Sequence, residues 1–148
     1  MDAVQGIAEL VAEDHRLIDA LFRQFDGAGG RAIAAQICEA LDQHASAEER
    51  FVDPALREGV ADGSYLAGKA TEARAHTKQL VKRISETSDE KALSELVGEL
   101  HAAVARHVAA EEGTLLPKMD SDLGLLDMDI FGAGSREFKR FARSAVSR

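Results

Sequence analysis

Four histidines in this sequence each interrupt a run of apolar residues that recur at helical spacing. In a helix, residues three or four positions apart lie on one face. His15 follows Val11 by four residues and precedes Ile18 by three, and the other three histidines stand in a similar relation to their apolar neighbours. We therefore expect four imidazole side chains to point into the interior of a helical protein. The four are His15, His44, His76 and His107.

Two of these histidines are each followed by a glutamate four residues later. An offset of four turns a helix ~40° past a full circle, whereas an offset of five turns it ~140°. Glu48 and Glu111 should therefore share a face with His44 and His107, while the glutamate directly after each of them turns away. A proline also stands ten residues after each of these two histidines. The chain thus reads as two copies of a histidine helix followed by a helix with histidine and glutamate.

Six interior side chains of this kind predict a metal site. Carboxylates are rarely buried unless they are paired or bound to a metal. We expect no lysine or arginine at the same interior positions, so without a bound cation the negative charges of the two glutamates would be uncompensated. A single buried histidine is more often a hydrogen-bonded core residue. Four histidines and two glutamates at one level instead favour a bound pair of cations, and imidazole with carboxylate suits iron, manganese or zinc.

Helical phase separates two other reactive side chains from this set. His101 lies six residues before His107, or ~240° around the helix, so it should face outward or lie on the flank. Cys38 stands in the same relation to His44 and is expected to be a packed or flanking thiol.

Composition excludes several classes of protein. The chain has 148 residues, 45% of them hydrophobic and 30% charged, which is typical of one globular domain. No apolar run approaches the ~18 residues of a membrane-spanning helix. The formal net charge of −8 argues against nucleic-acid binding. One cysteine and a start without a basic signal-peptide region favour the cytosol. From the charge and the short apolar runs, we expect neither nucleic acid nor membrane as a partner.

Four helices must position the histidines. Apolar stripes run over residues 4–25, 33–55, 66–84 and 93–115, with short breaker segments between them. Short links make neighbouring helices antiparallel. We therefore predict an all-α, up-down-up-down four-helix bundle.

The bundle is assigned to residues 1–119, and residues 120–148 to a C-terminal extension. Residues 87–90 predict a capping box at the start of the fourth helix, and Pro117 is expected to end that helix. A short amphipathic helix is expected over 135–146, packed on the bundle or on a partner. That partner is a second copy of the chain or another protein.

The pattern resembles the hemerythrin-like (HHE cation-binding) domain family over residues 4–119, with signature-like segments at 48–56 and 111–117. Members of that family are four-helix bundles that hold a non-haem di-iron centre. The resemblance implies that Glu48 and Glu111 bridge the two metals. It also implies that the first two histidines serve one metal and the last two the other. Ferritin-like bundles use Glu-x-x-His instead, and no histidine here has a glutamate three residues before it.

Two positions depart from the family pattern. Oxygen-carrying hemerythrins have a further histidine one turn before the one matching His76, and here that residue is Glu72. An aromatic residue usually precedes the first proline, and here that residue is Asp53. We predict Glu72 as an additional ligand of the metal held by His76. The alternative is that it points to solvent or pairs with Lys69.

Together with the family resemblance, these residues imply a non-haem di-iron protein that binds, senses or reacts with O₂, NO or peroxide. The expected cofactor is two iron ions (Fe²⁺ or Fe³⁺), which an oxo or hydroxo group can bridge, with zinc or manganese as substitutes. Peroxide decomposition is one activity that such a site permits, and the spacing does not choose between sensing, storage and catalysis. The alternative function is a metal-stabilised interaction, signalling or iron-handling module with no chemistry of its own.

Overall fold

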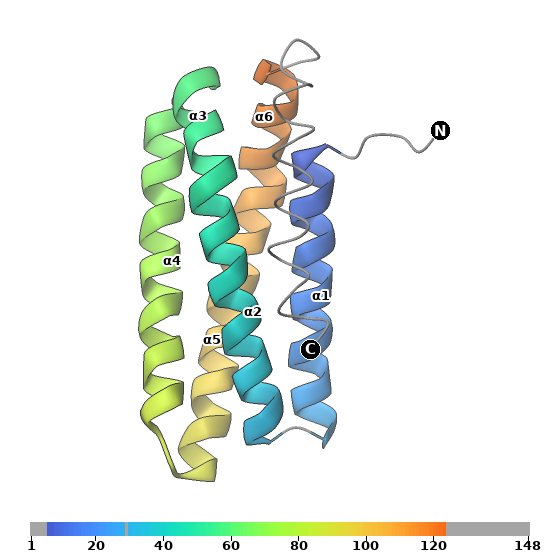
Figure 1. Ribbon diagram of the computed structural model, residues 1–148, viewed down its shortest axis with the longest axis vertical. Coiled ribbons are helices and arrows are strands. Elements are labelled where there is room, and N and C mark those ends of the chain that lie inside the picture. Colours follow the sequence, from blue (N-terminus) through green and yellow to red (C-terminus); the bar gives the residue numbers. More distant parts are fainter. Residues whose placement is uncertain (1–5, 29, 124–148) are drawn as a thin grey trace, which may run out of the picture.

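The structure of the protein, a computed structural model, describes residues 6–28 and 30–123, and the described part is built of helices without strands. Four long rods stand side by side and alternate in direction, which confirms the predicted all-α, up-down-up-down bundle (Figure 1). Two of the rods continue through a short π-helical segment into a further helix. In chain order the elements are α1 (Ile7–Ala28), α2 (Arg31–Ala47), η1 (Glu48–Val52), α3 (Asp53–Gly59), α4 (Gly63–Glu86), α5 (Glu90–Ala110), η2 (Glu111–Leu115) and α6 (Leu116–Leu123).

Each of the two π-helical segments ends two residues before a proline. A proline has no N–H to donate, and its ring crowds the carbonyl four residues earlier. Before Pro54, the Asp53 N–H donates to the carbonyl of Glu48, and before Pro117 the Leu116 N–H donates to that of Glu111. These bonds span five residues and widen the turn, so each helix passes through its proline. The expectation that Pro117 ends the fourth helix is therefore wrong.

The connections between the rods are short. Between α3 and α4, Asp62 has a left-handed backbone with φ of 61°. The next residue, Gly63, lies so close to α3 that a Cβ there would be 1.7 Å from the carbonyl oxygen of Leu56. Between α4 and α5, the Asp89 side chain accepts a 2.9 Å hydrogen bond from the N–H of Ala92. Asp89 is thus the N-cap of α5, and the capping box predicted to start at Thr87 is two residues too early.

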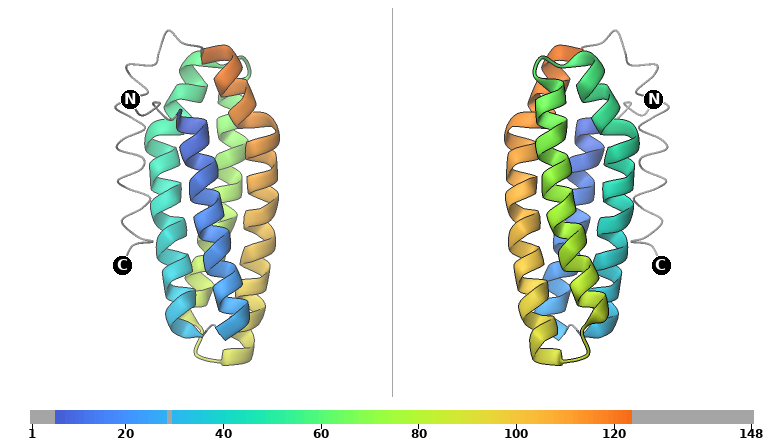
Figure 2. Two further views of the ribbon diagram at one scale, coloured as in Figure 1. Left: turned by 90° about the vertical axis from the view of Figure 1, so that its right-hand side faces the viewer. Right: turned by 90° about the vertical axis from the view of Figure 1, so that its left-hand side faces the viewer.

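The apolar core is divided into two parts along the bundle. The upper core includes Val11 and Leu56 and lies toward α3 and α6, which Figure 1 shows at the upper end of the bundle; the lower core includes Ile18, Phe22 and Leu100. His15 stands between Val11 and Ile18 in α1, so the histidines lie at the level between the two cores. Both views in Figure 2 show the four rods side by side along the length of the bundle.

Two further expectations concern the ends and the surroundings of the chain. The helix α6 continues to Leu123, past the boundary placed at residue 119, whereas the helix expected over 135–146 lies outside the described residues. None of the helices in the described part is both long and apolar enough to cross a bilayer.

Candidate metal centre

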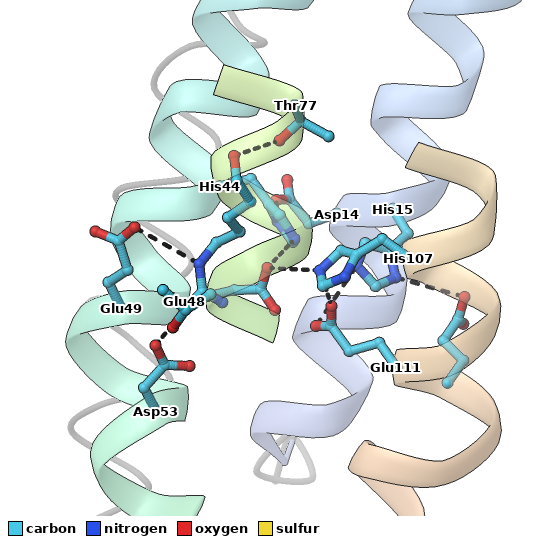
Figure 3. A network of polar contacts seen from close by, with 12 residues as sticks. Asp14, His15, His44, Glu48, Glu49, Asp53, Thr77, His107 and Glu111 are labelled. Atoms are coloured by element: carbon cyan, nitrogen blue, oxygen red, sulfur yellow. Dashed lines mark hydrogen bonds and ion pairs between the residues drawn. The ribbon is translucent and has the colours of Figure 1, made fainter. Parts of the chain in front are cut away.

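Two buried glutamates form the centre of the polar level. Glu48 and Glu111 are each 1% exposed and are the first residues of η1 and η2. Each pairs with the histidine one turn before it, as the spacing predicts. His44 Nε2 lies 3.0 Å from Glu48 Oε1, and His107 Nε2 lies 2.5 Å from Glu111 Oε2. Figure 3 shows these four side chains directed toward one another from two rods.

Contacts between helices join the two pairs and add His15. His107 Nε2 lies 3.6 Å from Glu48 Oε1, and His15 Nε2 from α1 lies 3.8 Å from Glu111 Oε1. The result is two overlapping groups of three residues whose ligand atoms lie within 4.8 Å of one another. The groups are His15, His44 and Glu111, and Glu48, His107 and Glu111.

The chemistry of these atoms fits a metal pair. Glu48 Oε1, both carboxylate oxygens of Glu111 and Nε2 of His107 are buried without a properly directed hydrogen bond from the described residues. Burying polar atoms in this way is unfavourable, and native cores rarely contain several together. Nitrogen and oxygen lone pairs that converge on common points suit a cation such as iron, manganese or zinc. The residues present therefore fit a metal centre.

Burial and mutual charge interactions strongly shift the pKa values of the carboxylates and imidazoles. Burial would raise the pKa of Glu48, but the charge of His44 and the close polar contacts within the cluster outweigh it and hold that pKa well below its usual range. Burial together with the charge of Glu48 raises the pKa of Glu111 to about 8. Burial and the charge of His44 lower the pKa of His15 to about 3. Burial opposes protonation of His107, yet the adjacent carboxylates raise its pKa to about 9. Without a cation, the cluster thus disfavours ionisation of both carboxylates together.

A buried aspartate, missed by the sequence analysis, contacts the cluster from outside. Asp14 is 4% exposed, and its carboxylate contacts His44 Nδ1 (Figure 3). A partner at Nδ1 orients the ring so that Nε2 is directed to the ligand position. Asp14 is four residues from the buried Leu10 and Ile18, so helical spacing could have placed it on the buried face. Only the tertiary structure identifies His44 as its partner.

His15 also has a carboxylate beside its Nδ1 atom, the ring nitrogen that faces away from the centre. Glu112 Oε2 lies 3.4 Å from His15 Nδ1, and the Glu112 side chain is 40% exposed. It turns away from the centre, as the spacing predicts, but it still reaches the outer nitrogen of a ligand.

A buried arginine also lies near the site. Arg74 of α4 is 4% exposed and donates through Nη2 to the carboxylate of Asp53, at the start of α3. Its Nε lies 3.5 Å from Glu49 Oε1, which Lys78 Nζ contacts at 2.8 Å. Arg74 thus pairs with Asp53 and Glu49, and among the described residues neither Glu48 nor Glu111 has a lysine or arginine partner. Arg74 compensates Asp53, the acidic residue that replaces an aromatic one, because a buried carboxylate needs a partner.

The structure leaves two predicted ligands outside the ligand groups. His76 is exposed, but it lines a hollow between α4 and α5 whose wall also includes His107 and Glu111. The Glu72 side chain is 77% exposed, and its Oε2 lies 3.9 Å from the Lys69 Nζ three residues earlier on α4. Glu72 thus lies at the surface, where the alternative placed it, because its face of α4 points to solvent.

The two residues set apart by helical phase also lie outside the groups. His101 Nε2 is 3.1 Å from Asp19 Oδ1, and its ring stacks on Phe22 with centroids 4.3 Å apart. Cys38 is a half-buried free thiol whose pKa is raised to about 11 by burial and by Asp42.

A family model described as Hemerythrin HHE cation binding domain matches residues 6–119 of the chain. This range includes all four described rods up to the first residues of α6, and every side chain of the cluster. Searches of curated proteins and of solved structures found no match.

Proposed function

The chain belongs to the hemerythrin HHE cation-binding domain family, and on this basis we propose that it is a non-haem di-iron protein whose site binds, senses or reacts with O₂, NO or peroxide. The family itself implies that the domain binds metal cations. The observation that carries the finer proposal is the pair of overlapping histidine and glutamate groups, which share Glu111. Two groups sharing a carboxylate suit two ions that lie close together.

The proposed ligands are the members of the two groups together with His76. We include His76 because the family resemblance implies it as a ligand and its side chain lines the same hollow as His107 and Glu111. We leave out Glu72 because its exposed carboxylate faces Lys69. The full set is His15, His44, Glu48, His76, His107 and Glu111.

When bound, a pair of iron ions supplies redox chemistry and exchangeable positions for small ligands. The residues of the chain supply negative charge, ligand orientation and apolar surroundings. Glu48 and Glu111 would offset part of the charge of the two cations, and Asp14 orients His44. The apolar cores on either side of the cluster keep water out along the length of the bundle, which strengthens the electrostatic interactions at this level. A free thiol at Cys38 agrees with the cytosolic location that we propose.

The test is metal analysis of protein purified without chelators or a histidine tag, followed by absorption spectra. We expect about two iron ions per chain and absorption bands that change when O₂, NO or peroxide is added. His107→Ala should lose metal, whereas the matched variant His101→Ala should retain it, because His101 pairs with Asp19 outside the cluster. A His101→Ala protein that loses metal while His107→Ala keeps it would overturn the ligand assignment. Iron-loaded protein whose spectrum responds to none of the three molecules would overturn the functional one.

A further inference from the structure

A large hollow lies between the neighbouring helices α4 and α5, which Figure 2 shows side by side. Its volume is about 520 Å³, within the ~300–1,000 Å³ range of pockets for organic ligands. A molecule the size of water occupies only ~30 Å³ of liquid. The hollow is therefore far larger than a diatomic gas or hydrogen peroxide requires.

The walls of the hollow are apolar because small residues stand where α4 and α5 face each other. Ala73 lies on α4, and Ala103 and Ala110 lie on α5. Leu66 and Leu115 extend the apolar wall toward the upper core. Alanines alone would only mark close packing of helices, but here they line open space.

Buried polar groups from the cluster form another part of the wall. Glu111 lines the hollow, is 1% exposed, and receives no properly directed hydrogen bond at either carboxylate oxygen from the described residues. His107 and His76 line the same space. The hollow therefore connects the outside of the bundle to the candidate metal centre.

Two cations line the hollow at its exposed side. Lys69 projects from α4 and Arg106 from α5, and both are exposed. Lys69 has Glu72 at 3.9 Å, whereas no carboxylate pairs with Arg106 in the part of the chain that the structure describes. In a protein with a formal net charge of −8, this local positive charge favours an anionic group at the rim.

We propose that this hollow is a binding pocket for a small carboxylate with an apolar body of about six to ten carbon atoms. The carboxylate lies at the rim between Lys69 and Arg106, and the hydrocarbon lies along the alanine walls toward His76. This inference rests on the proposed function for its inner end, because it places an organic molecule beside the metal centre. It makes the substrate or effector of that centre an organic acid rather than a gas alone.

Calorimetric titration of the full chain, loaded with zinc so that no redox reaction intervenes, tests the proposal with octanoate as the probe. We expect saturable binding that is at least about tenfold tighter than that of acetate, because burial of each CH₂ group adds affinity. Ala73→Leu fills the pocket and should weaken octanoate binding at least about tenfold. Ala75→Leu is the matched control, since Ala75 is exposed on the same helix and does not line the hollow.

A second pair of variants tests the head group. Arg106→Gln should weaken the binding of octanoate but not that of octanol, whereas Lys82→Gln, at an exposed position of α4 outside the hollow, should change neither. If Ala73→Leu does not fold, Ala110→Leu replaces it, because Ala110 is an exposed member of the same wall.

The outcomes separate the two proposals. Protein that holds its metals but does not bind octanoate, or in which Ala73→Leu and Ala75→Leu behave alike, overturns the pocket and leaves the metal site standing. Protein that binds octanoate with the expected variant pattern but takes up no metal supports the pocket and overturns the proposed function.

Discussion

Among single residues, Asp14 has the clearest role outside the ligand set, since its buried carboxylate contacts the Nδ1 atom of His44. A hydrogen bond to the outer nitrogen fixes the tautomer and orientation of a ligating imidazole. We expect Asp14→Ala to lower metal affinity about 10- to 100-fold, with partial rescue by Asp14→Asn, which keeps a hydrogen-bond acceptor. Competition with a chromophoric zinc chelator measures this effect.

The matched control is Asp19→Ala, because Asp19 also contacts a histidine ring nitrogen, Nε2 of His101, but outside the cluster. It should leave metal affinity unchanged. Equal losses in the two variants would show that Asp14 acts through general stability and not through His44.

Among the elements, α3 and α4 are joined by an ion pair that the bundle buries. Arg74→Met would leave Asp53 buried without its partner, and removing one member of a buried pair typically destabilises by about 3–5 kcal/mol. The double variant Arg74→Met with Asp53→Leu should recover most of that loss, because two apolar side chains can replace a buried pair. Urea unfolding measures the free energy of each variant.

The control for this pair lies on the surface. The Arg83 and Glu99 side chains are about 60% exposed, with 3.9 Å between Nη1 and Oε2, so Arg83→Met should change stability by less than about 1 kcal/mol. If Arg74→Met also changes the free energy of unfolding by less than about 1 kcal/mol, the buried pair has no structural role.

The close approach of α3 to the start of α4 gives a second prediction at this scale. A Cβ at Gly63 would lie 1.7 Å from the carbonyl oxygen of Leu56, so Gly63→Ala must displace the backbone of one helix. We expect a loss of at least about 2 kcal/mol in the free energy of unfolding. Gly98→Ala, in the middle of α5 with open space around it, should instead stabilise by about 0.5–1 kcal/mol. Thermal and urea unfolding of the two variants distinguish these opposite signs.

For the whole molecule, the polar level makes stability depend on metal and pH. Glu111 has a pKa of about 8 in the folded chain against an ordinary value of 4.5, so the stability from its proton is complete below 4.5 and is lost as pH rises to about 8. His107, with its pKa raised to about 9, acts in the same direction above 6.5. His15 acts in the opposite direction, because its pKa of about 3 removes stability as pH falls from 6.5.

The two raised groups outweigh His15 at alkaline pH, so the metal-free protein should be less stable at pH 8 than at pH 5. Metal binding itself strengthens as the ligands lose protons. We therefore expect a chelator to lower the melting temperature more at pH 8 than at pH 5. Calorimetric melting curves with and without chelator check this expectation. Curves that do not change with chelator at either pH would contradict a buried metal site.

The sequence by itself determined the helical bundle and the centre of the site. Offsets of three and four fix a common face within one helix, whatever surrounds it. Glu48 and Glu111 could therefore be assigned beside His44 and His107, and His101 could be set apart. The order of four stripes with short links left few arrangements other than an antiparallel bundle.

Only the tertiary structure decided which residues of different helices meet. Spacing within α1 places Asp14 on a buried face, but the rotation of α2 brings His44 to it. Arg74 lies in the interior because Asp53 reaches it from another helix. His76 faces an open hollow, because the alanines of α4 and α5 leave the space beside it unfilled. Helical periodicity is local, whereas the rotation, separation and partners of whole helices depend on the packing of the entire chain.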